Sequence, residues 1–248
     1  MSSSSDFAHN SPEKQADPDT SASSHHLNRL LTAGGHPNDR SQVPLPVVHR
    51  SFANPTPLGL ISFAADIFLI SVYGLHARGI QSPNVMIGML VFFGGVCQFL
   101  AGIMEFVTGN TFGATVFSSY GAFNLSYALI YLPGSGIMAA YTDPSTGAVS
   151  PEFNRALAMY LWVWFIITVL YTVAAMRSTW VLFLDLVALD VCLLLLACGF
   201  MVNVPGLLTA GYSFGLVVCF LSFWAGCTGL WAGITPVKLP AFEMTSNV

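Results

Sequence analysis

Charged residues are scarce in this sequence. Lysine, arginine, aspartate and glutamate make up 8% of the 248 residues, whereas a soluble globular domain carries about 25%. Nine of the twenty charges precede residue 58, so only eleven are spread over the remaining 191 residues. So little charge excludes an ordinary water-soluble enzyme, and a net charge of −4 without a basic patch excludes nucleic acid as a partner.

Motifs of the common enzyme classes are also missing. The chain contains no GxSxG, HExxH or GxxxxGK[ST] sequence, and no pair of histidines spaced for a metal within an apolar stretch. The five cysteines lie inside apolar runs without a CxxC pair, which is typical of small buried side chains. We therefore expect no enzymatic activity, no cofactor and no metal.

The sequence does contain six apolar stretches of about 20 residues, the length of a helix that spans a bilayer core. They lie at about 58–77, 84–106, 112–132, 156–176, 179–200 and 211–234. Backbone polar groups in lipid must be paired within the segment, so these stretches predict helices. The expected fold is an all-α membrane protein with a six-helix transmembrane domain over residues 51–235.

The two flanking segments have a different composition. Residues 1–50 are rich in Ser, Pro, Gly and His and predict a disordered tail, and residues 236–248 form a short tail. Six spans place both termini on one side, which collects Arg177 and Lys238 together with the arginines at 40 and 50. The opposite side has Arg78 and Arg155, so the bias predicts that both termini and both tails are cytoplasmic.

Four acidic residues lie inside the predicted spans, which contain no Lys or Arg: Asp66, Glu105, Asp185 and Asp190. An ionised carboxylate at the bilayer centre costs about 2.5–3.5 kcal/mol on insertion scales. Two interpretations stay open for Asp66, Asp185 and Asp190. They are proton-coupling groups, among which Asp190 near mid-span is the most conspicuous, or they are carboxylic acids that bond a neighbouring helix.

Small and polar residues predict close helix packing and an aqueous route. Gly88, Gly95 and Gly102 recur every seven residues and share a helix face that another backbone could approach. Gln98 and Glu105 are also seven apart, and both inter-helix hydrogen bonding and a place in a transport path are open for them. The third span is rich in hydroxyl and amide side chains, which suits a helix lining a path for a small polar solute.

Residues 54–60, NPTPLGL, resemble the NPAPLGL signature of the acetate uptake transporter family. That family includes bacterial succinate–acetate permeases and fungal acetate permeases, some of them linked to ammonia export. Further matches follow in the family's order, at residues 93–95 with Gln98 and Glu105, then at residues 110–113 and 119–121. The resemblance extends from about residue 54 to residue 235.

The resemblance implies a six-helix protomer, assembled as a homo-hexamer of separate pathways in the plasma membrane. It implies movement of acetate and similar short monocarboxylates, linked to protons. It assigns the hydrophobic constriction of the pathway to Phe63, Tyr120 and Leu189. The polar positions that it implies along the pathway are Asn54, Gln98, Glu105, Thr111 and Ser119.

The chain departs from the family pattern at Asn124, where an aromatic is usual, and at Asp66, Asp185 and Asp190, where the pattern is not acidic. An ionised carboxylate would repel a carboxylate solute at 4 Å by about 1–4 kcal/mol. The added acids therefore leave two alternatives: they carry the coupled proton, or the chain exports ammonia or ammonium. A membrane sensor or scaffold that moves no solute is a third interpretation.

Overall fold

The computed structural model describes residues 52–244, and the predicted disorder of residues 1–50 lies outside that range. Over the described residues the chain is helical, and the two isolated β-bridges, at Thr142–Val149 and Thr179–Glu243, extend into no strand. The prediction of an all-α architecture is confirmed.

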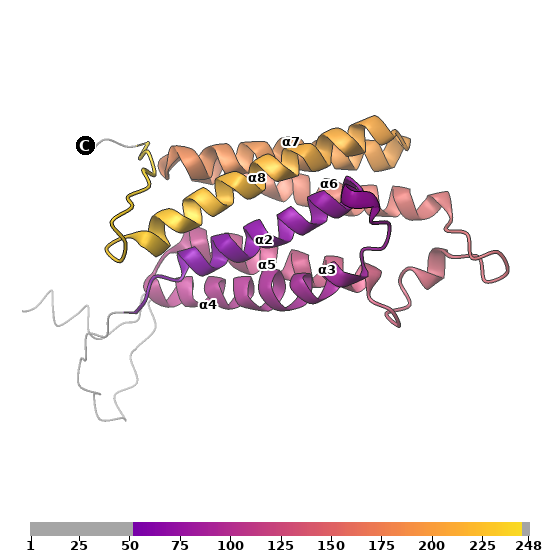
Figure 1. Ribbon diagram of the computed structural model, residues 1–248, viewed down its shortest axis with the longest axis horizontal. Coiled ribbons are helices and arrows are strands. Elements are labelled where there is room, and N and C mark those ends of the chain that lie inside the picture. Colours follow the sequence, from indigo (N-terminus) through magenta and orange to yellow (C-terminus); the bar gives the residue numbers. More distant parts are fainter. Residues whose placement is uncertain (1–51, 245–248) are drawn as a thin grey trace, which may run out of the picture. The chain divides into compact units, whose positions relative to one another are not determined.

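In the described part of the chain, six long helical segments alternate in direction (Figure 1). They are α2 (Thr56–Gly74), the continuous run α3 (Asn84–Met89), η2 (Leu90–Cys97) and α4 (Gln98–Thr108), then α5 (Thr111–Tyr131), α6 (Pro151–Ala174), α7 (Trp180–Val202) and α8 (Pro205–Trp231). Short 3₁₀ turns lie at η1 (Ala77–Gly79), η3 (Ala139–Tyr141) and η4 (Ala175–Arg177). We call the end where α2, α5 and α7 begin the Thr56 end, and the opposite end the His76 end.

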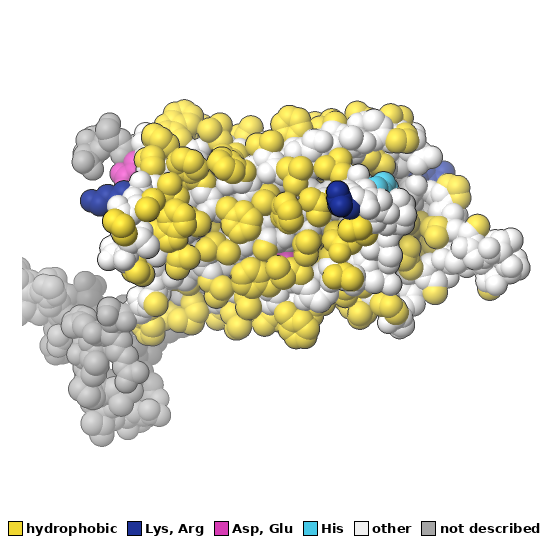
Figure 2. All heavy atoms as spheres, viewed as in Figure 1, with side chains coloured by type: hydrophobic (Ala, Val, Ile, Leu, Met, Phe, Trp, Pro, Cys, Tyr) yellow, Lys and Arg dark blue, Asp and Glu magenta, His cyan; other side chains and the backbone are white. Residues whose placement is uncertain are grey.

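The outer surface of the bundle suits a lipid environment. Within the described residues, five of the six segments are long and apolar enough to cross a membrane, with mean hydropathy values from 1.6 to 2.6. The sixth, α5, has 21 residues but carries the hydroxyl and amide side chains noted in the sequence. Apolar side chains cover most of the face shown in Figure 2.

Three helices begin earlier than the sequence predicted, and each has a proline in its first turn. α2 begins at Thr56 rather than 58, α6 at Pro151 rather than 156, and α8 at Pro205 rather than 211. Proline fits there because the first N–H groups of a helix have no intrahelical partner. Arg155 therefore lies within α6, which corrects its placement in the preceding loop; the other predicted ends lie within three residues of those observed.

The helices surround a centre filled by aromatic side chains. α2 packs against α8 on one side and against η2 and α4 on the other, while α7 packs between α6 and α8. α5 packs closely against η2 and α4, whereas α6 reaches it mainly through side chains. Two of these links are the hydroxyl pairs Tyr120–Thr168 and Ser126–Tyr160, at 2.8 and 2.7 Å. Aromatic side chains therefore fill the interface between α5 and α6, where the two helix backbones are not closely packed.

Glycine residues let η2 and α4 approach α5 closely, which confirms part of the predicted contact face of Gly88, Gly95 and Gly102. A Cβ placed on Gly102 would lie 2.5 Å from the backbone nitrogen of Ser118 on α5. A Cβ on Gly95 would lie 2.6 Å from the Leu125 side chain, but one on Gly88 meets nothing within 4 Å. The predicted contact face therefore includes Gly95 and Gly102 and does not extend to Gly88.

Local hydrogen bonds hold the loop and the C-terminal segment at the two ends of the helix bundle. At the His76 end, the Ser145 hydroxyl and backbone N–H donate to the Asp143 carboxylate, which lowers the pKa of this exposed group. At the Thr56 end, residues 235–244 fold back on the bundle. The backbone N–H of Trp180 donates to the Phe242 carbonyl at 2.8 Å and thereby satisfies the first turn of α7.

Candidate functional site

Three cavities follow one another through the bundle and share lining residues. The Thr56 cavity, of about 60 Å³, lies among the first turns of α2, α5 and α7. The central cavity, of about 40 Å³, lies between the middles of α2, α5, α6, α7 and α8. The His76 cavity, of about 130 Å³, lies where α2 and α5 end. Together they mark one route from the Thr56 end to the His76 end.

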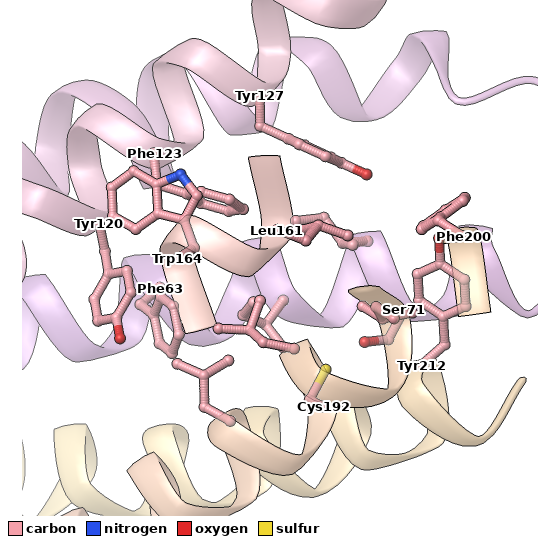
Figure 3. Close-up of a pocket in the computed structure, with 15 residues that line it drawn as sticks. Phe63, Ser71, Tyr120, Phe123, Tyr127, Leu161, Trp164, Cys192, Phe200 and Tyr212 are labelled. Atoms are coloured by element: carbon pink, nitrogen blue, oxygen red, sulfur yellow. The ribbon is translucent and has the colours of Figure 1, made fainter. Parts of the chain in front are cut away.

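Phe63 and Tyr120 form the wall between the first two cavities, because both residues line both spaces. Their ring centroids are 5.2 Å apart, with the planes tilted by 31°. Leu189 on α7 lines the central cavity beside them, and all three side chains are at most 5% exposed. Figure 3 shows the Phe63 and Tyr120 rings side by side. The structure thus brings together the three residues that the resemblance assigned to a constriction.

Hydrogen bonding and ring packing fix the orientation of Tyr120. The Thr168 hydroxyl donates to the Trp164 carbonyl at 2.8 Å, so the Tyr120 hydroxyl is the donor in its 2.8 Å bond to Thr168. The Tyr120 ring lies 6.1 Å from the Trp164 ring and 5.9 Å, edge-on, from that of Tyr171. Sequence reasoning missed Trp164 and Thr168, since neither stands out in an apolar helix.

A second narrowing separates the central cavity from the His76 cavity. Ile70, Tyr127 and Tyr212 line both spaces. The Tyr212 ring, drawn near Ser71 in Figure 3, packs against Gly74, where a side chain would collide with it. The central cavity therefore has aromatic side chains at both ends. Tyr212 was not predicted, because nothing in the sequence distinguishes it from tyrosines that only pack.

Two of the predicted polar positions lie at or beside the Thr56 cavity. Gln98 lines this cavity, and its Oε1 accepts a hydrogen bond from Asn124 Nδ2 at 3.1 Å. Glu105 is 2% exposed; it accepts from the hydroxyl of Thr56, a residue lining the cavity, and from that of Thr108 at 3.3 Å. Glu105 therefore ties the last turn of α4 to the first turn of α2.

Three other predicted polar positions lie outside the three cavities. Asn54 accepts from the backbone N–H of Thr56 at 3.1 Å and faces an outer groove, and Thr111 is exposed at the start of α5. Ser119 donates to the Thr115 carbonyl at 2.7 Å and is 2.8 Å from the Tyr171 hydroxyl. Asn54 thus binds the backbone of the turn that precedes α2, and a role of all three in the solute path stays a prediction.

Asp66 lies on α2, three residues after Phe63, and is completely buried. Its carboxyl packs against the backbone of Gly94 in the π-helical segment η2, close to the amide of Asn124. Neither carboxyl oxygen has a hydrogen-bond partner among the described residues. Asp66 does not line any of the three cavities. The space that a Gly94 side chain would need is thus filled by a carboxyl from α2.

We predict that Gly94→Ala disrupts the bundle and that Asp66→Ala partly restores it in the double variant. Overpacking of this kind costs about 1–3 kcal/mol, whereas shortening Asp66 frees the volume that the new methyl group occupies. Thermal unfolding of the purified variants in detergent measures the effect. A double variant no more stable than Gly94→Ala alone would contradict this packing.

Asp185 and Asp190 have different environments although both lie on α7. Asp185 is 2% exposed and lines the Thr56 cavity, and the Ser222 hydroxyl of α8 lies 2.9 and 2.8 Å from its two oxygens. Asp190 is half-buried and accepts from the Thr172 hydroxyl of α6 at 2.7 Å. It lines none of the three cavities. The most conspicuous acid in the sequence is therefore not the one that lines a cavity.

Curated relatives of the chain include fungal proteins, some of which are named for the transport of ammonia or acetate. Accumulation of dyads protein 2 and Ammonia transport outward protein 2, both of Saccharomyces cerevisiae, are 42% and 37% identical; each alignment covers 81% of this chain and 69% of the relative. Acetate permease A of Emericella nidulans is 37% identical over 73% of this chain and 62% of its own length. The chain thus spans about two thirds of the length of these relatives.

The fold also matches a solved structure, that of the bacterial acetate channel SatP. The two share 26% sequence identity and a TM-score of 0.66, over 77% of this chain and 100% of the other. The family model described as the GPR1/FUN34/yaaH family matches residues 37–246, which include all six long helical segments. The resemblance seen in the sequence is confirmed, and the chain belongs to the GPR1/FUN34/yaaH family.

Proposed function

We propose that the protein is a transporter for acetate and related short monocarboxylates, linked to protons, and not an enzyme. The observation that carries this proposal is the row of cavities divided by the Phe63–Tyr120 pair. Such a route admits a small solute and obstructs a large one, because two buried rings must be passed. The names of Acetate permease A and of the acetate channel SatP support a short carboxylate as the solute.

The proton linkage rests on the acids of the route and its surroundings. Asp185 lines the Thr56 cavity, and Asp66 and Asp190 lie in helices that carry the constriction. α2, α5, α7 and α8 contain no Lys or Arg, so charged carboxylates there have no basic partner within these helices. A protonated state lowers the cost of placing such groups in the membrane.

We place the protein in the plasma membrane as a homo-hexamer with both termini in the cytoplasm. Apolar side chains support association or lipid contact: Met159, Val163, Ile166 and Leu170 follow one face of α6 and are 56–64% exposed. Arg177 and Lys238 follow α6 and α8 at the Thr56 end, the end at which α2 begins. Native mass spectrometry tests the hexamer, and accessibility of a C-terminal tag in intact cells tests the orientation.

Expression in cells that lack their own acetate carrier tests the transport proposal. We expect labelled acetate uptake above that of the empty vector, increasing as the external pH falls because protons enter with the solute. Cells expressing a surface-matched unrelated six-helix protein provide the control for acetic acid that crosses lipid unaided. Uptake equal to this control, at confirmed surface levels, would contradict the proposal.

Export of ammonia or ammonium is the second candidate. The name of Ammonia transport outward protein 2 supports it, as does the acid on the Thr56 cavity, because an ionised carboxylate attracts a cation. Methylammonium flux without acetate flux favours this candidate. Binding of either solute without flux in vesicles would instead favour a sensor or scaffold.

A further inference from the structure

Asp185 differs from the other acids of the membrane region in its access to the route. Asp185 lines the Thr56 cavity one turn before Leu189, the α7 residue at the constriction. Asp66, Glu105 and Asp190 do not line any of the three cavities. A solute that crosses from the Thr56 end to the Phe63–Tyr120 pair therefore passes Asp185.

Ser222 holds this carboxyl in place without satisfying it. The hydroxyl lies 2.9 and 2.8 Å from the two oxygens, but a hydroxyl has one hydrogen and can serve one oxygen at a time. A carboxylate accepts about four hydrogen bonds. Asp185 therefore keeps accepting capacity for a donor that arrives in the cavity.

Among the residues that the structure describes, none of those lining the cavity is a Lys, Arg or His that could neutralise Asp185. The titratable groups around it are Tyr120 across the cavity on α5, Cys219 beside Ser222 on α8, and Glu105 of α4, which is bonded to the lining residue Thr56. The neutral donors that line the cavity are the amides of Gln98 and Asn110 and the hydroxyl of Thr56.

We propose that Asp185 restricts the route to solutes that carry a transferable proton. The inference rests on the proposed transport of monocarboxylates and states in which form they pass. Two adjacent carboxylates 4 Å apart would disfavour a bare anion by roughly 5-fold to roughly 10³-fold. One shared proton removes this repulsion, because the carboxyl that holds it donates to an oxygen of the other. The exchange moves a single proton between the solute carboxyl and Asp185, and no other bond changes.

The proposal predicts that wild-type protein moves acetate without carrying current. Purified protein in a planar bilayer with an acetate gradient at pH 7 measures this, and labelled acetate uptake by vesicles of the same lipid confirms that flux occurs. Protein-free membranes give the background of acetic acid that crosses lipid. Asp185→Asn keeps the shape and an acceptor for Ser222 but removes the negative charge. We expect it to conduct acetate as a current and to lose the increase of uptake at low pH.

Asp143→Asn is the control, since it makes the same change at an exposed loop carboxyl outside the three cavities. It should stay electroneutral and keep the wild-type pH profile. Should Asp185→Asn fail to reach the membrane, Ser222→Ala decides. This variant removes the hydroxyl that donates to the charged Asp185 carboxylate. Asp185 then keeps its proton to higher pH, so the pH midpoint of uptake moves upward.

The possible failures are distinguishable. Wild-type acetate current, or an Asp185→Asn variant that transports with an unchanged pH profile and no current, overturns the inference and leaves acetate transport intact. If Asp185→Asn does not reach the membrane, an unchanged pH midpoint of uptake in Ser222→Ala overturns the inference. Absence of acetate flux in the wild type, with or without a methylammonium current, overturns the transport proposal and this inference with it.

Discussion

Phe63→Ala is expected to raise lactate uptake relative to acetate uptake by at least about tenfold. The Phe63 ring separates the Thr56 cavity from the central cavity, so its removal joins the two spaces. Lactate is larger than acetate by one carbon and one hydroxyl, and a pocket that fits the smaller solute closely discriminates one extra carbon alone by about 10-fold or more. Labelled lactate and acetate uptake by vesicles at pH 7, corrected for protein-free vesicles, measures the ratio.

Two variants control this experiment. Phe92→Ala makes the same change in η2 at a side chain that is 70% exposed on the outside of the bundle, and it should leave the ratio unchanged. Tyr120→Phe keeps the ring and loses only the hydroxyl bonded to Thr168, so its effect should be smaller than that of Phe63→Ala. Equal ratios for Phe63→Ala and Phe92→Ala would show that Phe63 does not limit solute size.

Gly102→Ala is expected to destabilise the bundle by about 1–3 kcal/mol. The new Cβ would lie 2.5 Å from the Ser118 nitrogen and 3.0 Å from its Cα, and a backbone cannot move aside as a side chain can. α4 and α5 must therefore separate, which also displaces Tyr120, two residues after Ser118. Thermal unfolding in detergent and acetate uptake should both decrease.

Gly88→Ala provides the control within the same helical run. Nothing lies within 4 Å of the position of its Cβ, so we expect wild-type stability and uptake. Loss of stability in both variants would point to a general cost of alanine in this segment. Wild-type stability of Gly102→Ala would contradict the close approach of α4 and α5.

The overall architecture could be predicted from the sequence because each span is long and apolar. The errors concentrate at helix starts, and they share a cause. Pro151 and Pro205 lie in the predicted breaks between helices and Pro57 precedes the predicted start at residue 58, whereas each belongs to a first turn. The Ser-Pro-Glu sequence at residues 150–152 carried the signal, since Ser150 is an N-cap and accepts a bond from the second residue of the turn.

The site was predicted less completely. Phe63, Tyr120 and Leu189 could be named because the resemblance placed them in motifs, and the structure brings them to one cavity. Which acid faces the route could not be predicted, because Asp185 and Asp190 differ by five residues and therefore by about 140° around α7. That difference decides whether a carboxyl faces Ser222 and the Thr56 cavity or faces Thr172 on α6.

The pairing of Asp66 with Gly94 shows a second reason why part of the site could not be predicted from the sequence. The two residues are far apart in the sequence, and their fit depends on the π-helical turn of η2 and on the approach of α2. A pair of glycines within an apolar run indicates close packing but does not identify what packs there. Only the three-dimensional arrangement reveals that a carboxyl fills the space.

The most direct test of the account is solute flux through purified wild-type protein in vesicles, measured side by side for labelled acetate and labelled methylammonium. We predict acetate uptake above protein-free vesicles, faster with an inward proton gradient, and no methylammonium uptake. Methylammonium uptake without acetate uptake, or no flux of either solute through folded protein, would contradict the proposed function.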